Sequence, residues 1–230
     1  MKYTLADRFM WLFLKGVCLK TLKAEHPEWD YKYIAKTAKQ TYRSMVEQTP
    51  SIGSYRENSL KKNLTGGMVW IAVFEAALEK YGDSMTTELY EKMCRATIAM
   101  PMMLKAAKRM KPFTAKFQQK AIEKARFENQ IDSPYNWHTK IVQGKVDEEF
   151  TVIYTKCGLC RLAKERGHSD ILPAMCRTDY IMFEAMGAIL HRDKTLSNGD
   201  DCCYYYCTKR GSEAEKTWLS QHPEGTFKPV

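Results

Sequence analysis

The hydrophobic pattern of this chain changes its period once, and that change constrains the fold more than any other feature. From Leu5 to about Arg126, apolar residues recur at helical spacing, which is the pattern of helices that bury one face. After Ser133-Pro134, apolar residues nearly alternate in short runs rich in Val, Ile, Tyr and Trp, as in half-buried strands. The sequence therefore predicts an α+β protein: a helical N-terminal half packed on a small antiparallel sheet with helices in the C-terminal half.

Prolines, glycines and capping residues place the boundaries of these elements. We predict helices at residues 5–23, 30–48, 60–80, 84–101 (with a kink at Pro101), 113–128, 159–167 and 171–186. We predict strands at residues 135–144 and 150–156, and a hairpin of residues 188–195 and 202–209 around the turn 197–200. We treat residues 1–230 as a single domain, with a mostly helical part (1–130), an antiparallel sheet plus two helices that carry a cysteine-rich site (131–210), and a C-terminal tail (211–230).

The composition supports a folded, soluble protein. Of the 230 residues, 44% are apolar and 27% are charged, which excludes disordered and collagen-like chains. The longest early apolar run, residues 9–14, is flanked by Asp7, Arg8 and Lys15. It is too short to span a membrane and lacks the layout of a secretory signal. We therefore expect a cytoplasmic protein without a membrane partner.

The formal net charge of +9 is concentrated in one segment. Between Met102 and Arg126 there are eight cations and one acid, Glu123. Their spacing is typical of the solvated face of amphipathic helices. The alternative is a surface for an anionic partner such as nucleic acid, which we do not expect. The sequence leaves a homo-oligomer open.

Cysteines are the most informative residues. Of the eight, Cys18 and Cys94 stand alone in helical stretches and are expected in the core, while the others crowd into about fifty residues: Cys157, Cys160, Cys176, Cys202, Cys203 and Cys207. The first pair is a Cys-x-x-Cys that follows a predicted strand and opens a helix, where thiol pKa values fall. We expect no metal or cofactor. The alternative is a zinc site of four thiolates, formed by Cys157, Cys160, Cys176 and Cys203.

A carboxylate and a guanidinium lie near these cysteines in the sequence. Asp179 follows Cys176 by three residues, so both side chains can share one side of a helix. In an apolar setting its carboxylate would suit a general base, or it would form an ordinary salt bridge. Strict alternation would place Leu190, Arg192 and Lys194 on one face of their strand and His191, Asp193 and Thr195 on the other. The guanidinium of Arg192 would bind a substrate carboxylate or hold Asp179 ionised.

The order of these residues resembles the L-2-amino-thiazoline-4-carboxylic acid hydrolase family. The resemblance rests on Cys157, then Gly167 and a helix, Cys176-x-x-Asp179, Arg192-x-x-Thr195-Leu196-x-x-Gly199, and Cys203 followed by aromatic residues. Family members usually carry an acidic residue and then Phe after the last motif cysteine, whereas this chain has Tyr204 and Tyr205. The ending also resembles that of 4-vinyl reductase-type sensor domains, some of which bind zinc through cysteines. A small-molecule or zinc-binding sensor without catalysis is therefore the alternative function.

The resemblance to the hydrolase family implies a small-molecule substrate, a 2-amino-thiazoline carboxylate or a related cyclic amidine, and ring-opening hydrolysis to an N-carbamoyl-cysteine type product. On residue chemistry, we expect Cys157 or Cys203 as a nucleophile or thiol-shuttling group. Asp179 is expected as the general base or as the charge that pairs with the cationic isothiouronium. Thr195 is expected to donate a hydrogen bond near the reacting centre. Candidates for substrate binding are Arg192, Cys176 and His168.

Overall fold

The computed structural model describes residues 1–145 and 147–222, and its helices and strands confirm the α+β class. The helices are α1 (Leu5–Glu25), α2 (Tyr31–Gln48), α3 (Lys61–Tyr81), α4 (Thr87–Ile98), α5 (Pro101–Lys108), α6 (Ala115–Glu128), α7 (Gly158–Glu165), α8 (Leu172–Ala185) and α9 (Glu213–Gln221). Short 3₁₀ turns are η1 (Gly82–Ser84), η2 (Ser169–Ile171) and η3 (Leu196–Asn198). The strands are β1 (His138–Gln143), β2 (Glu149–Lys156), β3 (Ala188–Lys194) and β4 (Cys203–Lys209).

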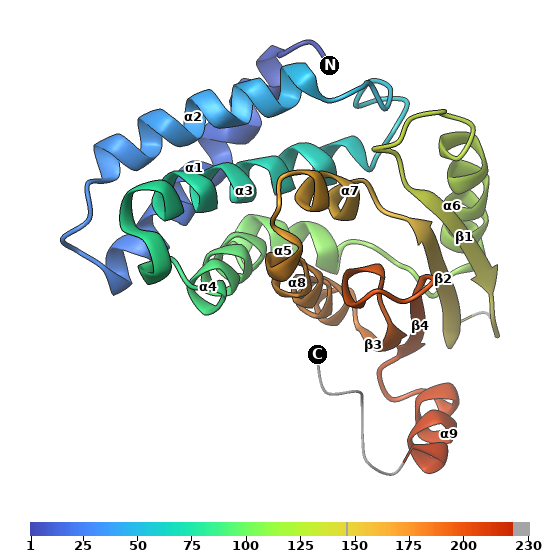
Figure 1. The fold of residues 1–230 in the computed structure, drawn as a ribbon. Helices are drawn as coiled ribbons and strands as arrows, with labels where there is room; N and C mark the ends of the chain where they lie inside the picture. The colour runs from blue at the N-terminus through green and yellow to red at the C-terminus, as the bar shows by residue number, and fades with distance from the viewer. Residues whose placement is uncertain (146, 223–230) are drawn as a thin grey trace.

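Helix α3 is the centre of the helical half. It is apolar nearly all round, and Met68, Ile71 and Val73 on different sides of it are fully buried. Helices α1 and α2 pack along it, and α4 packs on α1 and α3 (Figure 1). A helix that is apolar all round has to be enclosed by other elements. The expected core cysteines, Cys18 and Cys94, are both fully buried here.

The four strands form one antiparallel sheet in the order β1-β2-β4-β3, so the predicted hairpin forms its β3 edge. One face of the sheet is apolar and includes Phe150, Val152, Leu190 and Cys207. Helix α6 covers this face over β1, and α8 covers it over β3. Cys203 and Tyr205 of β4 lie on the same buried face, because side chains two apart on a strand point to the same side. The sheet therefore presents β4 side chains to α8.

An irregularity in β3 corrects the predicted facing of its last residues. The pairing with β4 shifts between His191 and Lys194, and Lys194 pairs with Tyr204. Tyr204 lies on the face of the sheet opposite Cys203 and Tyr205, and both Lys194 and Tyr204 are exposed. Thr195 is instead buried. The bulge therefore places Thr195, and not Lys194, on the side of Arg192.

Two boundaries differ from the sequence prediction. Pro101 does not kink a continuous helix: α4 ends at Ile98, and Pro101 begins α5 at its first position, where a missing backbone N–H costs nothing. The segment expected to be a C-terminal tail contains α9, which packs on β4, while residues 223–230 lie outside the described part of the chain.

The cations of the segment 102–126 are all exposed, as predicted for a solvated face. Among the described helices, none is long and apolar enough to cross a membrane.

Candidate functional site

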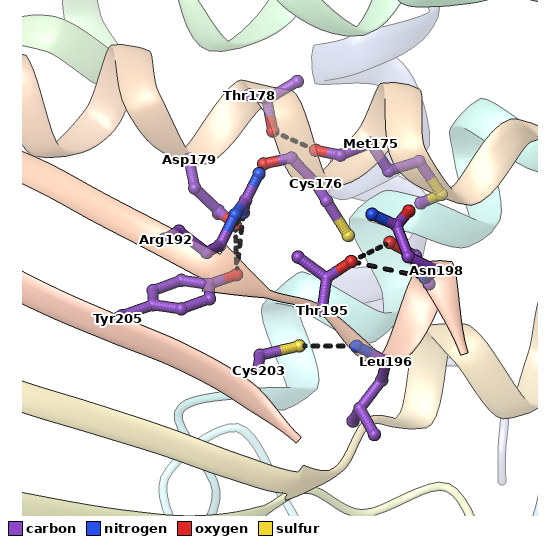
Figure 2. A network of polar contacts seen from close by, with 11 residues as sticks. Met175, Cys176, Thr178, Asp179, Arg192, Thr195, Leu196, Asn198, Cys203 and Tyr205 are labelled. Atoms are coloured by element: carbon purple, nitrogen blue, oxygen red, sulfur yellow. Dashed lines mark hydrogen bonds and ion pairs between the residues drawn. The ribbon is translucent and has the colours of Figure 1, made fainter. Parts of the chain in front are cut away.

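The site is centred on a guanidinium that links α8 to the sheet. Arg192 of β3 reaches α8, where its Nη1 donates to the backbone oxygen of Cys176 at 2.9 Å and to Asp179 Oδ2 at 3.1 Å (Figure 2). The same nitrogen lies 3.1 Å from the hydroxyl of Tyr205 on β4. The Tyr205 hydroxyl in turn donates to Asp179 Oδ2 at 2.6 Å. Three elements are therefore joined by one closed network of charge-assisted hydrogen bonds.

Aromatic rings enclose the guanidinium of Arg192. Its carbon atom Cζ lies 4.8 Å from the centre of the Tyr180 ring and 5.2 Å from that of Tyr205. Only 4% of the Arg192 side chain is exposed. Cation–π contacts strengthen when water is excluded, so this enclosure stabilises the cation where it stands. The expectation that Arg192 holds Asp179 agrees with this geometry, and any substrate carboxylate has to share the guanidinium with protein groups.

The carboxylate of Asp179 is only partly used by the protein. Oδ2 accepts from Arg192 and Tyr205, whereas Oδ1 accepts no hydrogen bond from the described residues, and 37% of the side chain is exposed. Burial by the surrounding protein raises the pKa of Asp179, although Arg192 and Tyr205 act in the opposite direction. A carboxylate whose pKa is raised and whose second oxygen has no hydrogen-bond donor among the described residues is suited to accept a proton from water.

A small cavity lies next to this network. It measures about 10 Å³ and is lined by Pro173, Cys176, Tyr180, Arg192, Asp193, Thr195, Ser197 and Asn198. That volume holds about one water molecule. Figure 2 shows Cys176 and Thr195 facing each other across this region, with the η3 turn beside them. A substrate larger than a water molecule does not fit this cavity as it stands.

The η3 turn is held by Thr195 and Cys203. The Thr195 hydroxyl lies 2.9 Å from that of Ser197 and accepts from the backbone N–H of Asn198 at 3.3 Å. The Cys203 sulfur accepts from the backbone N–H of Leu196 at 3.3 Å. Gly199, with φ near 90°, ends the turn in the left-handed region that favours glycine. Cys203 is 5% exposed, so its sulfur supports the turn from within the core.

The thiols near the network differ in how readily they ionise. Burial raises the pKa of Cys203 to about 11 and that of Cys176 to about 12. A hydrogen bond from the Cys160 thiol lowers the pKa of Cys157, while the same contact raises that of Cys160. The charge of Asp179 acts on Cys157 and on Cys203, and that of Cys157 acts on Cys203, which places these groups in one electrostatic cluster. Of these four thiols, Cys157 is the one whose pKa is lowered, so its sulfur ionises more readily than the other three.

His168, expected to bind substrate, has its contacts elsewhere. Its Nε2 lies 3.1 Å from Glu75 of α3, and its ring packs edge-on against Phe74. Arg166 pairs with the same glutamate. These contacts fasten the end of α7 to α3. The sequence could not reveal this role, because Glu75 is 93 positions away and belongs to a helix of the other half.

The four cysteines of the alternative zinc site do not form a metal cage. Across residues 1–145 and 147–222, no three or more His, Cys, Asp or Glu side chains are grouped so that they could hold a metal ion. Zinc in a structural site needs four ligands at about 2.0–2.3 Å in a tetrahedron. The arrangement of the described thiols therefore gives no support to the zinc alternative.

Two larger cavities border the network, and Arg192 itself lines the first of them. One of about 510 Å³ is on the outer face of the sheet under α9, where Trp218 stacks on His191 with ring centres 3.8 Å apart. Another, of about 270 Å³ and mostly apolar, lies between α6, α8 and the inner face of the sheet. Tyr154 and Phe183 line this apolar cavity, and both rings pack against Tyr205. The ring of Tyr205 thus connects the apolar cavity with the polar network.

Tyr205 is the site residue that the sequence interpretation missed. From the sequence it is noted only as a departure from the family motif, yet its hydroxyl joins Arg192 and Asp179. One signal was available: Tyr205 is two residues from Cys203 and therefore shares its face of the strand. A buried tyrosine hydroxyl needs a polar partner, and Asp179 and Arg192 were the nearest candidates.

The fold and the site together define an α+β protein with a buried ionic network between one helix and a four-stranded antiparallel sheet. The family model of L-2-amino-thiazoline-4-carboxylic acid hydrolase matches residues 57–206, which is well over half of the chain. The chain therefore belongs to this family, as the motif order indicated. The match spans α3 to most of β4 and contains the whole network. No curated protein and no solved structure matches the chain.

Proposed function

We propose that this protein is a hydrolase that opens the ring of a 2-amino-thiazoline-4-carboxylate or a closely related cyclic amidine. Water adds to the ring carbon that lies between nitrogen and sulfur. The bond from this carbon to sulfur then breaks, the sulfur takes up a proton, and the product is an N-carbamoyl-cysteine with a free thiol. The reaction consumes one water and needs no redox partner. The reaction class comes from family membership, and the residue roles come from the geometry of the network.

The single observation that carries the proposal concerns Asp179, which lies within the residues that the family model matches. One oxygen of its carboxylate is hydrogen-bonded to the protein, and the other is not bonded by the described residues. Its Oδ2 is fixed by Arg192 and Tyr205, and its Oδ1 is open to accept a proton from the attacking water. A base held at one oxygen keeps its orientation while the other reacts. The substrate amidine is a cation when protonated, and the Asp179 charge also favours binding of that form.

The remaining groups have supporting roles. Arg192 carries five N–H donors in a rigid fork, so the guanidinium can bind the substrate carboxylate while it keeps contacts to the protein. The Thr195 hydroxyl lines the small cavity, where a hydrogen bond would stabilise the tetrahedral centre. Cys203 positions the η3 turn through Leu196. If a thiolate attacks in place of water, Cys157 is the sulfur with the lowered pKa.

The test measures turnover of 2-amino-thiazoline-4-carboxylate by the full-length protein. Thiol release is followed with a chromogenic disulfide, and the product is identified by mass spectrometry. We expect Asp179→Asn to lower kcat/KM by about 100-fold or more, since a positioned base contributes that much. The matched control is Asp170→Asn, an exposed aspartate in η2, which should keep the wild-type rate. No turnover by the wild-type protein, or full activity in Asp179→Asn, would overturn the proposal.

Two cysteine variants separate the water and thiolate routes. With water as the nucleophile, Cys157→Ser retains turnover and no covalent adduct accumulates. With Cys157 as the nucleophile, Cys157→Ser is inactive, and acid quenching of the wild-type protein traps a substrate adduct on Cys157. Cys203→Ser is expected to affect turnover mainly through the position of the η3 turn.

A further inference from the structure

The junction of β2 and α7 holds two nucleophilic groups that the proposed attack by water leaves unused. Cys157 is the last residue before α7, and Cys160 lies in its first turn. Both are half-buried and free. The side chains of Cys157 and Cys160 hydrogen-bond to each other, so the two sulfurs lie next to each other at the start of α7. The pair therefore has the spacing of a dithiol that can close into a disulfide.

The segment between the two cysteines is held in place by close packing. Gly158 lies against the backbone oxygen of Tyr135, and a Cβ atom at this position would be only 2.0 Å from that oxygen. Leu159 packs against Gly67 of α3, where an added Cβ would be 2.3 Å from the leucine side chain. The turn is therefore packed closely against Tyr135 on one side and α3 on the other, which restricts movement of the backbone between the two thiols.

The two thiols are chemically unequal. The Cys160 thiol donates toward the Cys157 sulfur, which lowers the pKa of Cys157 and raises that of Cys160. The backbone N–H groups of Cys160 and Leu159 act on Cys157 in the same direction, although the Cys157 sulfur does not form a regular cap of α7. One sulfur is thus prepared to attack and the other to follow it, which is the division of roles in a redox-active dithiol.

We propose that Cys157 and Cys160 form a redox-active dithiol that exchanges with low-molecular-weight disulfides. The Cys157 thiolate attacks one sulfur of the small disulfide, the S–S bond breaks, and one small thiolate leaves. Cys160 then loses its proton, and its sulfur attacks that of Cys157 and releases the second thiolate. The two cysteines are oxidised to a disulfide, and the small disulfide is reduced to two thiols after protonation. This inference does not depend on the proposed hydrolysis.

The neighbouring thiols Cys176 and Cys203 define the competing pairings. Both act electrostatically on Cys160, so they lie in the same cluster. Cys203, however, is 5% exposed and bound to Leu196 N–H, and Cys176 is separated from Cys157 by eighteen intervening residues. Only Cys160 is attached to the same helical turn as Cys157. We therefore expect the 157–160 disulfide to form in preference to the other pairings.

The experiment treats reduced, full-length protein with oxidised glutathione and maps the products by mass spectrometry without reduction. We expect the wild-type protein to form a Cys157–Cys160 disulfide. Cys160→Ser should stop at a glutathione adduct on Cys157. Cys157→Ser should react at Cys160 at least about tenfold more slowly than Cys160→Ser reacts at Cys157, because thiolate availability controls attack. Cys202→Ser, which alters a half-buried cysteine outside the pair, is the control and should form the disulfide normally.

Three results would overturn the proposal. The first is a disulfide that joins Cys157 to Cys176 or Cys203. The second is an adduct on Cys157 in Cys160→Ser that forms no faster than an adduct on Cys202. The third is an unreactive wild-type protein whose thiols all react after unfolding in denaturant. Circular dichroism of each variant establishes that it is folded before its reactivity is compared.

Discussion

Asp7 in the helical half and Asp179 beside the sheet are both held by hydrogen bonds, but only Asp7 accepts hydrogen bonds at both of its carboxylate oxygens. Asp7 is fully buried; its Oδ2 accepts from the backbone and hydroxyl of Thr4, and its Oδ1 accepts from the Tyr55 hydroxyl. Asp179 has both donors on Oδ2 and an open Oδ1. A carboxylate satisfied at both oxygens fixes structure, whereas one satisfied at a single oxygen keeps an acceptor for chemistry. The cysteines of the two halves also differ: those of the helical half are enclosed in the core, whereas Cys157 beside the sheet is available for reaction.

The largest expected effect is the difference in thiol reactivity between the halves. Burial raises the pKa of Cys18 to about 12, and Cys18 and Cys94 are fully enclosed. They should react with iodoacetamide only when the protein opens, about 1,000-fold or more slowly than Cys157. Peptide mapping after timed alkylation measures each rate. In denaturant the three cysteines should react alike, and equal rates in the native protein would contradict the comparison.

The two aspartates can be separated by paired substitutions. Asp179→Asn should lower kcat/KM by about 100-fold and cost about 1 kcal/mol of unfolding free energy, because the amide oxygen still accepts a hydrogen bond. Asp7→Asn should cost about 2 kcal/mol, since an NH₂ group then faces a donor, with little change in kcat/KM. Urea denaturation and turnover are measured on both variants. Matching profiles for the two would end the distinction between structural and reactive carboxylates.

Two glycines offer a second contrast between the halves. An alanine Cβ at Gly158 would lie 2.0 Å from a backbone oxygen, whereas at Gly16 of α1 nothing lies within 4 Å. We expect Gly158→Ala to lower the unfolding free energy by about 2 kcal/mol, because backbone has to shift. Gly16→Ala should raise it by about 0.5–1 kcal/mol, since alanine restricts the unfolded chain and favours helix. Denaturation midpoints test both, and a stabilised Gly158→Ala would show that the β2–α7 junction is loose.

The same division explains what could be predicted from the sequence. Helices α1 to α3 were predicted to within about two residues, because periodicity and caps such as Thr4 and Asp30 act locally. The pairing of Arg192 with Asp179 was one of the two roles that the sequence suggested for Arg192, and the structure shows this contact. The bulge in β3 could not be predicted, because it depends on pairing with β4. The contact of His168 with Glu75 depends on how α7 packs on α3, which no local pattern records.

Tyr205 allows the finest test, because one oxygen atom distinguishes its polar role from its packing role. Its hydrogen bond lowers the pKa of Asp179 against the effect of burial. Tyr205→Phe keeps the ring contacts with Tyr154 and Phe183 but removes that bond, so the pKa of Asp179 should rise further. A base has to be ionised to act, and the acidic limb of the pH profile of kcat/KM should therefore move to higher pH.

At a fixed pH on that limb, Tyr205→Phe should lose about tenfold in kcat/KM, and it should recover part of the loss at higher pH. A merely structural role predicts a loss that does not vary with pH. Tyr204→Phe is the matched control, because Tyr204 lies on the opposite, exposed face of β4 and should leave the profile unchanged. If the acidic limb stays in place in Tyr205→Phe, then either Asp179 is not the base or Arg192 alone sets its ionisation.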